Sequence, residues 1–170
     1  MVISEIVARM PSGRTHLRIE AILLFGWTAL AGYLLSIRSL SVDHVVAFVL
    51  AYAFSMLFLS PDLDLARSGA SRRWGAARLI WAPYAALFRH RGLSHHPLVG
   101  PLTRILYLGL IGVLAWTVVL VVSGRPARIL TPSLAILGAA LAGLYLPNAT
   151  HIAADRVVSA WRRGRRKRRL

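Results

Sequence analysis

Residues Ser60–His96 read SPDLDLARSGASRRWGAARLIWAPYAALFRHRGLSHH, and the rest of the chain is organised around this stretch. The whole sequence holds only six Asp and Glu residues against 21 Lys and Arg residues, so the paired carboxylates Asp62 and Asp64 stand out from its composition. Two histidines, His90 and His95, lie near the end of the same stretch. Carboxylates and imidazoles together are typical ligands of divalent metal ions. The stretch therefore predicts a cation site.

The composition indicates a small membrane protein. The chain has 170 residues, of which 56% are hydrophobic, and soluble domains are usually less apolar, at about 45–50%. Four apolar stretches approach or reach the roughly 20 residues that a membrane-spanning helix needs. They are Ala21–Ile37, Val45–Ser60, Ile105–Pro126 (interrupted only by Arg125) and Ile129–Thr150.

The fold expected from this pattern is all-α, with about four transmembrane helices and one short interfacial helix. The interfacial helix is expected at Leu79–Phe88, which is about half as long as a span and contains Pro83. Residues 1–160 are expected to form a single helical membrane domain, and residues 161–170 a basic tail. The first apolar run has no small-residue cleavage site, so we expect an uncleaved span, with translation starting at Met1 or at Met10.

The distribution of basic residues predicts the topology. The N-terminal segment, the long loop with Arg104, and the segment after Asp155 hold 3, 7 and 8 Lys and Arg residues, against 1 and 2 in the other two loops. This bias predicts a multi-pass inner-membrane protein with both termini and the long loop in the cytoplasm. The histidine and aspartate side chains that are considered below as metal ligands then all lie on the cytoplasmic face.

Spacing supports a shared site. His151 and Asp155 are four residues apart, so on a helix that continues past Pro147 they share one face. Asp62 and Asp64 flank a single residue and can reach one ion or bridge two. The chain has no cysteine, so a metal must be held by oxygen and imidazole ligands.

Each of these residues also has an ordinary structural interpretation. Asp62 is a candidate helix cap, as are Asn148 and Thr150 before the last helix, and Ser41 is well placed to cap the second helix. His16 and His90 fit interfacial polarity at a basic membrane edge, and Asp155 beside Arg156 fits a weak surface ion pair. Asp43 and His44 fit loop polarity, and Gly138, Ala139, Ala140, Ala142 and Gly143 fit a small-residue packing face. Taken together, seven histidine and aspartate side chains at one membrane face are better explained by a metal site than by seven unrelated structural roles.

The segments MPSGRTH, SPDLD, HRGLSHH and HIAAD, in this order between apolar helices, resemble the bacterial membrane-bound metal-dependent hydrolases of the YdjM type. They are even more similar to a sister family of uncharacterised bacterial metal-binding membrane proteins. The resemblance covers Met10 to about Asp155. YdjM-type proteins often carry a histidine directly after the second Asp, where this chain has Leu65.

The resemblance implies a set of metal ligands and a reaction. The implied ligands are His16, Asp62, Asp64, His90, His95, His151 and Asp155, whereas His96 has no counterpart and is left out. The implied activity is metal-dependent hydrolysis, in which Zn²⁺ or Mn²⁺ lowers the pKa of a water and polarises a phosphoryl or acyl oxygen. Arg91 is the candidate for binding an anionic substrate.

Two other functional classes fit parts of the sequence. A metal-binding sensor or carrier that hydrolyses nothing is the first, although the middle of the spans lacks the ionisable residues that a midplane ion path needs. A membrane-tethered nucleic-acid binder is the second. The formal net charge of +15 permits it, but interleaved aromatics and a nucleic-acid motif are missing, so no specific nucleic-acid partner is expected.

The tail Trp161–Leu170 reads WRRGRRKRRL and has two main interpretations, with salt-dependent binding of nucleic acid as a weaker third. It fits a clamp on anionic lipid headgroups with Trp161 at the interface, and equally a topology signal. The expected partners are therefore membrane lipids.

The sequence predicts that replacing Asp64 or His95 with Ala removes bound divalent metal, because the Asp62/Asp64 and His90/His95 pairs concentrate oxygen and imidazole ligands. Elemental analysis of the purified wild type and both variants checks this. Equal metal content in all three proteins would contradict it.

Overall fold

The computed structural model describes residues 13–64, 68–88, 96–124 and 131–167, and all of its regular elements are helices. This confirms the all-α prediction for the described ranges. The α-helices and 3₁₀ helices (η) follow one another as α2 (Gly13–Ser36), α3 (Val42–Phe58), η1 (Pro61–Asp64), α4 (Gly69–Arg73), η2 (Gly75–Trp81), α5 (Ala82–Leu87), α6 (Val99–Ser123) and α7 (Leu134–Lys167).

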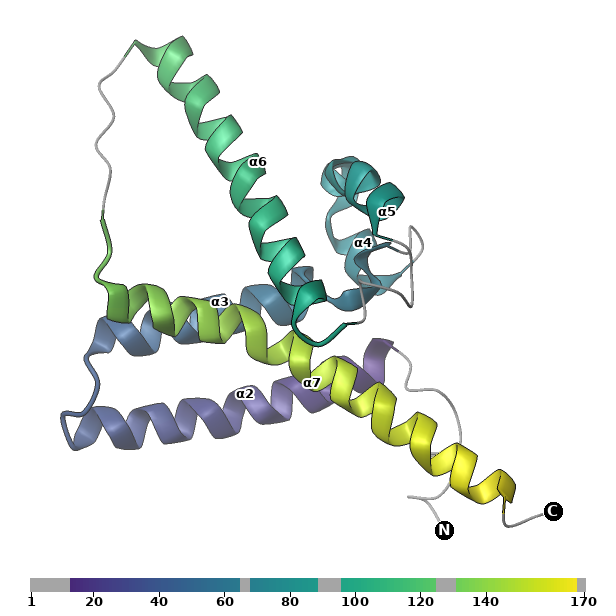
Figure 1. Cartoon of the computed structure of the whole chain (residues 1–170). Helices are drawn as coiled ribbons and strands as arrows, with labels where there is room; N and C mark the ends of the chain where they lie inside the picture. Colours follow the sequence, from purple (N-terminus) through teal and green to yellow (C-terminus); the bar gives the residue numbers. More distant parts are fainter. Residues whose placement is uncertain (1–12, 65–67, 89–95, 125–130, 168–170) are drawn as a thin grey trace.

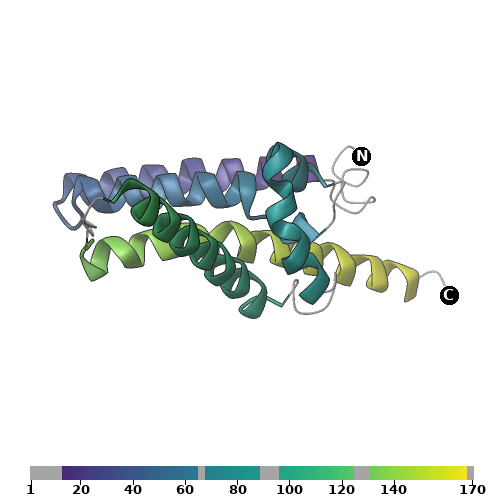
Figure 2. The ribbon, with the colours of Figure 1, turned by 90° about the horizontal axis from the view of Figure 1, so that it is seen from above.

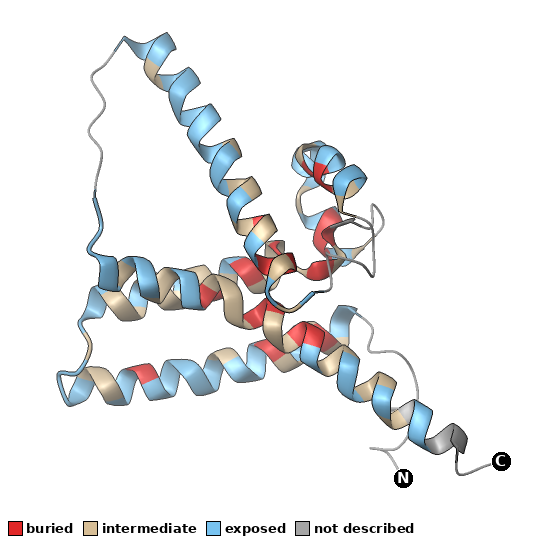
Figure 3. Ribbon diagram, in the orientation of Figure 1, coloured by how far each residue is buried: buried red, intermediate tan, exposed pale blue. Residues whose placement is uncertain are grey.

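Helices α2, α3 and the first half of α7 lie side by side and form the central bundle (Figures 1 and 2). Helix α3 makes its most extensive contacts with α7 and further contacts with α2. Helix α6 diverges from this bundle and approaches it at its N-terminal end (Figure 1). The buried residues gather where the start of α2, the end of α3, the start of α6 and the middle of α7 meet (Figure 3).

Within the described ranges, three helices are long and apolar enough to cross a membrane: α2, α6, and α7 from Leu134 to Trp161. Helix α3 has 17 residues, which corresponds to about 26 Å against a hydrocarbon core of about 30 Å. The count of four spans therefore stays a prediction for α3. The outer faces of the long helices expose large apolar side chains such as Phe25 and Val122, as expected of surfaces that face lipid.

The backbones of helices α3 and α7 lie very close together at Gly143. A Cβ atom added at this buried position would lie 2.5 Å from the Phe48 carbonyl oxygen and 2.9 Å from the Tyr52 nitrogen. Gly138, on the same small-residue stretch, has no atom within 4 Å of such a Cβ. The absence of a side chain is therefore required at Gly143, where it allows the backbones to meet.

A buried polar network connects α6 and α3 to α7. Arg104 of α6 is 1% exposed, and its Nη1 donates to Asn148 Oδ1 and, at 3.4 Å, to the Leu59 carbonyl. Asn148 Nδ2 in turn donates to Ser55 Oγ at 2.9 Å and to the Leu144 carbonyl at 3.0 Å. Ser55 Oγ donates to the same carbonyl at 2.6 Å. These side-chain hydrogen bonds connect the backbone of α7 at Leu144 with α3 and α6.

Short helices cover the C-terminal end of α3. Arg73 Nη1 donates to the Leu57 carbonyl and Trp74 Nε1 to the Phe58 carbonyl, both at 2.9 Å, so two carbonyls at the end of α3 find partners. Behind them, an apolar cluster packs against the start of α6 and contains Leu59, Leu63, Ala70, Trp81 and Tyr84. This cluster fixes α4 beside the end of α3.

Several local predictions have clear outcomes. Ser41 is the N-cap of α3, as expected, and its N–H donates to His44 Nδ1 at 3.3 Å. Asp43 and His44 were predicted to be loop residues, which is wrong because both lie in the first turn of α3. The expected helix at Leu79–Phe88 is divided between η2 and α5, with Pro83 in the first turn of α5, where its missing N–H costs no hydrogen bond.

Helix α7 also differs from expectation at two points. Asn148 and Thr150 were candidate caps of a separate last helix, but α7 is continuous through Pro147, so neither residue begins a helix. The helix continues to Lys167, and the tail is therefore helical from Trp161 to that residue.

We predict that Gly143→Ala destabilises the protein by about 1–3 kcal/mol, because the added methyl group must push α3 and α7 apart. Gly138→Ala, with open space at its Cβ, is the matched control and should leave stability unchanged or slightly higher. Thermal unfolding in detergent measures both. Equal unfolding temperatures of the two variants would contradict the close contact.

Candidate metal centre

The site is built on α2 and α7, which run in opposite directions and each carry a histidine followed four residues later by a carboxylate. On α2 the pair is His16 and Glu20, and on α7 it is His151 and Asp155. Residues four apart lie on one face of a helix. Because the helices are antiparallel, the histidine of each can meet the carboxylate of the other.

The structure shows this reciprocal pairing. His16 Nε2 lies 3.1 Å from Asp155 Oδ1, and His151 Nδ1 lies 3.3 Å from Glu20 Oε1. The two imidazole rings stack with their centroids 3.7 Å apart. His16, Glu20 and His151 are each no more than 4% exposed, whereas the Asp155 side chain is partly exposed.

Asp62 brings a third carboxylate from η1. Helix α3 ends before Ser60-Pro61, where the proline turns the chain, and the Asp62 N–H faces Ser60 Oγ at 3.4 Å. The Asp62 side chain is partly exposed, and its Oδ2 lies 3.8 Å from His151 Nε2. Asp155 Oδ2 lies 3.9 Å from the same nitrogen. His151 Nε2 therefore faces two carboxylates, while Nδ1 faces Glu20.

These residues fit a divalent metal ion. Donor atoms of His16, His151 and Asp155 all lie within 4.8 Å of one another. Ligands about 2.0–2.1 Å from a tetrahedral ion are about 3.4 Å apart, close to the separations of 3.1–3.9 Å between the Nε2 atoms and the carboxylates of Asp62 and Asp155. In addition, His16 Nδ1 is buried and has no hydrogen-bond partner among the described residues, and a buried polar atom is costly unless an ion or a water completes its contacts.

Glu20 is a residue that the sequence interpretation missed. It lies at the edge of the first apolar stretch, where it passes for ordinary boundary polarity, yet it is buried and contacts His151 Nδ1. Tyr52 of α3 donates to the Glu20 carbonyl at 3.2 Å and fixes this turn of α2. Metal-binding histidines usually donate their second N–H to a carboxylate in this way. The spacing of four residues from His16, which matches that of His151 and Asp155, is the signal that could have identified it.

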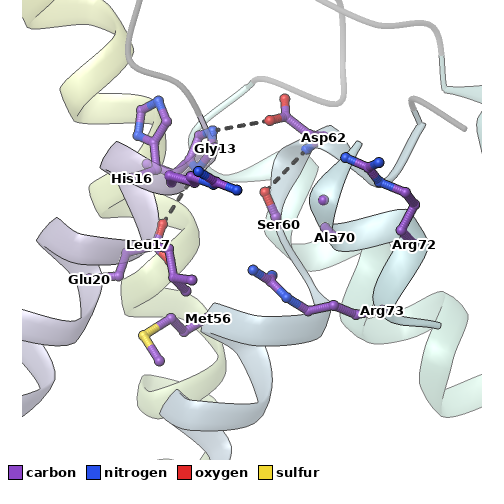
Figure 4. Close-up of a pocket in the computed structure, with 13 residues that line it drawn as sticks. Gly13, His16, Leu17, Glu20, Met56, Ser60, Asp62, Ala70, Arg72 and Arg73 are labelled. Carbon is purple, nitrogen blue, oxygen red and sulfur yellow. Dashed lines mark hydrogen bonds and ion pairs between the residues drawn. The ribbon is translucent and has the colours of Figure 1, made fainter. Parts of the chain in front are cut away.

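A pocket of about 340 Å³ opens beside the centre. Its wall includes His16, Glu20, Asp62 and His151, together with Arg14 of α2 and Arg72 and Arg73 of α4. Figure 4 shows Arg72 and Arg73 reaching from α4 toward the side on which Ser60, Asp62 and His16 lie. The volume is in the range of small-ligand sites.

The structure brings four of the predicted site residues together: His16, Asp62, His151 and Asp155. Asp64 ends η1, and its side chain is not among those described. His90, Arg91 and His95 lie outside the described residues. His96, which was left out of the ligand set, accepts from the N–H groups of Leu98 and Val99 at the start of α6.

Comparisons with known proteins agree with a metal centre. The profile of a family described as "Uncharacterized metal-binding protein (DUF2227)" matches residues 11–165. An uncharacterized protein of Aquifex aeolicus (strain VF5) is 41% identical over 66 residues, which cover 39% of this chain and 47% of that protein. The match thus spans about half the length of this relative. No solved structure matches the chain.

We predict that Glu20→Gln weakens metal binding by about 10–100-fold, because the amide cannot supply the charge that orients and strengthens His151 as a ligand. The matched control is Asp43→Asn, which makes the same chemical change in the first turn of α3, at the other end of the bundle. Competition of Zn²⁺ or Mn²⁺ with a chelator gives the affinities. Unchanged affinity in Glu20→Gln, or an equal loss in the control, would contradict the role of Glu20.

Proposed function

The chain belongs to the family of uncharacterized metal-binding proteins (DUF2227), and we propose that it is a membrane-bound metal-dependent hydrolase that cleaves a phosphoester or an ester. The observation that carries this proposal is the position of the histidine and carboxylate cluster on the wall of a pocket. A metal ion with only a structural role needs a closed ligand shell, whereas a catalytic ion needs space for water and substrate beside it. The pocket supplies that space.

In this proposal His16, Asp62, His151 and Asp155 hold the ion. Imidazole and carboxylate ligands without thiolates suit Zn²⁺ or Mn²⁺. When bound, the ion supplies Lewis acidity, which lowers the pKa of a water and polarises the oxygen under attack. Glu20 orients the His151 ring through Nδ1, and the His151 ring stacks on the His16 ring and keeps it in place. Asp62 is partly exposed and lines the pocket, so its carboxylate can accept a hydrogen bond from a water there.

The proposed location is the inner membrane, with both termini and the site on the cytoplasmic side. The three long apolar helices support membrane insertion, and the basic segments at the N-terminus, in the long loop and at the C-terminus support the orientation. In the proposed topology the site lies at the end of the bundle where α2 begins and α3 ends. The basic C-terminal end of α7 then extends toward anionic lipid headgroups.

We expect the purified protein, loaded with Zn²⁺ or Mn²⁺ in lipid nanodiscs, to hydrolyse a substrate in a screen of phosphomonoesters, phosphodiesters and acyl esters. Asp62→Asn should lower the rate by about 10–100-fold, because the amide removes a charged ligand, and Asp43→Asn should leave it unchanged. Full metal occupancy without turnover of any substrate in the screen would overturn the hydrolase and favour a non-catalytic metal sensor or carrier.

A further inference from the structure

The pocket beside the metal centre combines the carboxylates of the centre with three guanidinium groups. Arg14 stands at the beginning of α2, and Arg72 and Arg73 belong to α4 on the opposite wall. These elements are far apart in sequence and meet because α4 is fixed against the end of α3 by Trp74 and the apolar cluster around Trp81. We propose that this pocket binds the phosphate group of a phosphoester, with Arg14 and Arg72 as its recognition residues.

The charges of the wall support this choice. The carboxylates of Glu20 and Asp62 face His151, so they belong to the metal centre and not to the rest of the pocket wall. A metal ion bound at the centre adds positive charge to that side of the pocket. The arginines line the rest of the wall. A position between a divalent ion and guanidinium groups favours an anion, because a cation there would be repelled by both sides.

The arrangement of the arginines favours a phosphoester over a carboxylic ester. Arg73 uses one of its donors on the Leu57 carbonyl, which fixes its guanidinium in the wall. Arg14 and Arg72 are exposed, and they belong to different elements that both line the pocket. Phosphate offers several oxygens to donors on different sides, and planar guanidinium groups bind pairs of them. A carboxylic ester is uncharged at the reacting group and needs no such clamp.

The phosphate group can come from a lipid headgroup or from a soluble phosphoester, and both share the chemistry that the pocket recognises. The volume of about 340 Å³ accommodates a headgroup or a small phosphoester but not whole acyl chains. Leu17 and Met56 line the same pocket and offer apolar contact to the remainder of either molecule. The inference rests on the proposed hydrolase for the fate of the bound group, whereas binding of phosphate is measured without turnover.

The test is equilibrium dialysis of radioactive inorganic phosphate against the metal-loaded protein in phosphatidylcholine nanodiscs. We expect Arg72→Gln and Arg14→Gln to weaken phosphate binding about tenfold or more, since each removes a charge-assisted hydrogen bond, while metal content stays at the wild-type value. Arg18→Gln is the matched control: it removes the same charge from an exposed site one turn further along α2, outside the pocket wall, and should bind phosphate like the wild type.

Competition then identifies the source. Stronger displacement by short-chain phosphatidic acid than by glycerol 3-phosphate assigns the pocket to a lipid headgroup, and the reverse order assigns it to a soluble phosphoester.

Phosphate affinity that is unchanged in Arg72→Gln and Arg14→Gln, or reduced equally in Arg18→Gln, would overturn the site. Loss of metal from the Arg72 variant would also overturn it, because the arginine would then support the centre. If arginine-dependent phosphate binding occurs without hydrolysis of any substrate, the hydrolase fails and the anion site stands. If only uncharged esters are cleaved and phosphate does not bind, the anion site fails and the hydrolase stands.

Discussion

The reciprocal pairing of two histidines with two carboxylates across antiparallel helices is the interaction on which this structure depends. His16 meets Asp155 and His151 meets Glu20, and the stacked imidazoles fill the space between α2 and α7. Burying ionisable groups next to a membrane is costly unless they find partners or a metal ion. The pairing therefore fixes the relative position of two helices whose paired residues Glu20 and His151 are 131 positions apart in the sequence.

The position of α7 also depends on contacts one or two turns before the centre. Gly143 allows the backbone of α7 to touch α3, and Asn148 connects Ser55 of α3 with Arg104 of α6. These contacts lie on the same helix as His151, so they determine where its ring is presented. Arg104 also reaches the carbonyl of Leu59, directly before the turn that presents Asp62. The apolar bundle and the polar site are thus parts of one packing arrangement, because the same backbone segments serve both.

The walls of the pocket have a different origin from its metal-binding side. Helix α4 provides Arg72 and Arg73, and it is held in place by hydrogen bonds to the last carbonyls of α3 and by aromatic packing against Trp81. A helix of five residues has little stability by itself. Its position is set by the end of α3, and the end of α3 is set by Pro61. The cationic wall and the carboxylate of Asp62 therefore share one structural support.

The sequence alone determined the all-α class, because four apolar runs approach or reach the length of a membrane-spanning helix. It also made His16, Asp62, Asp64, His90, His95, His151 and Asp155 candidates for one site, since the predicted topology puts them on one membrane face and the family resemblance implies them as ligands. The tertiary structure decided the rest. Glu20 is part of the site because α7 packs against α2 and brings His151 to its carboxylate. Asn148 is not a helix cap, because it lies inside α7 and bonds to Ser55 of α3. Both assignments depend on which helices pack against each other. Local spacing gives the face of a helix on which a side chain lies, but only the packing of a second helix against that face determines its partner.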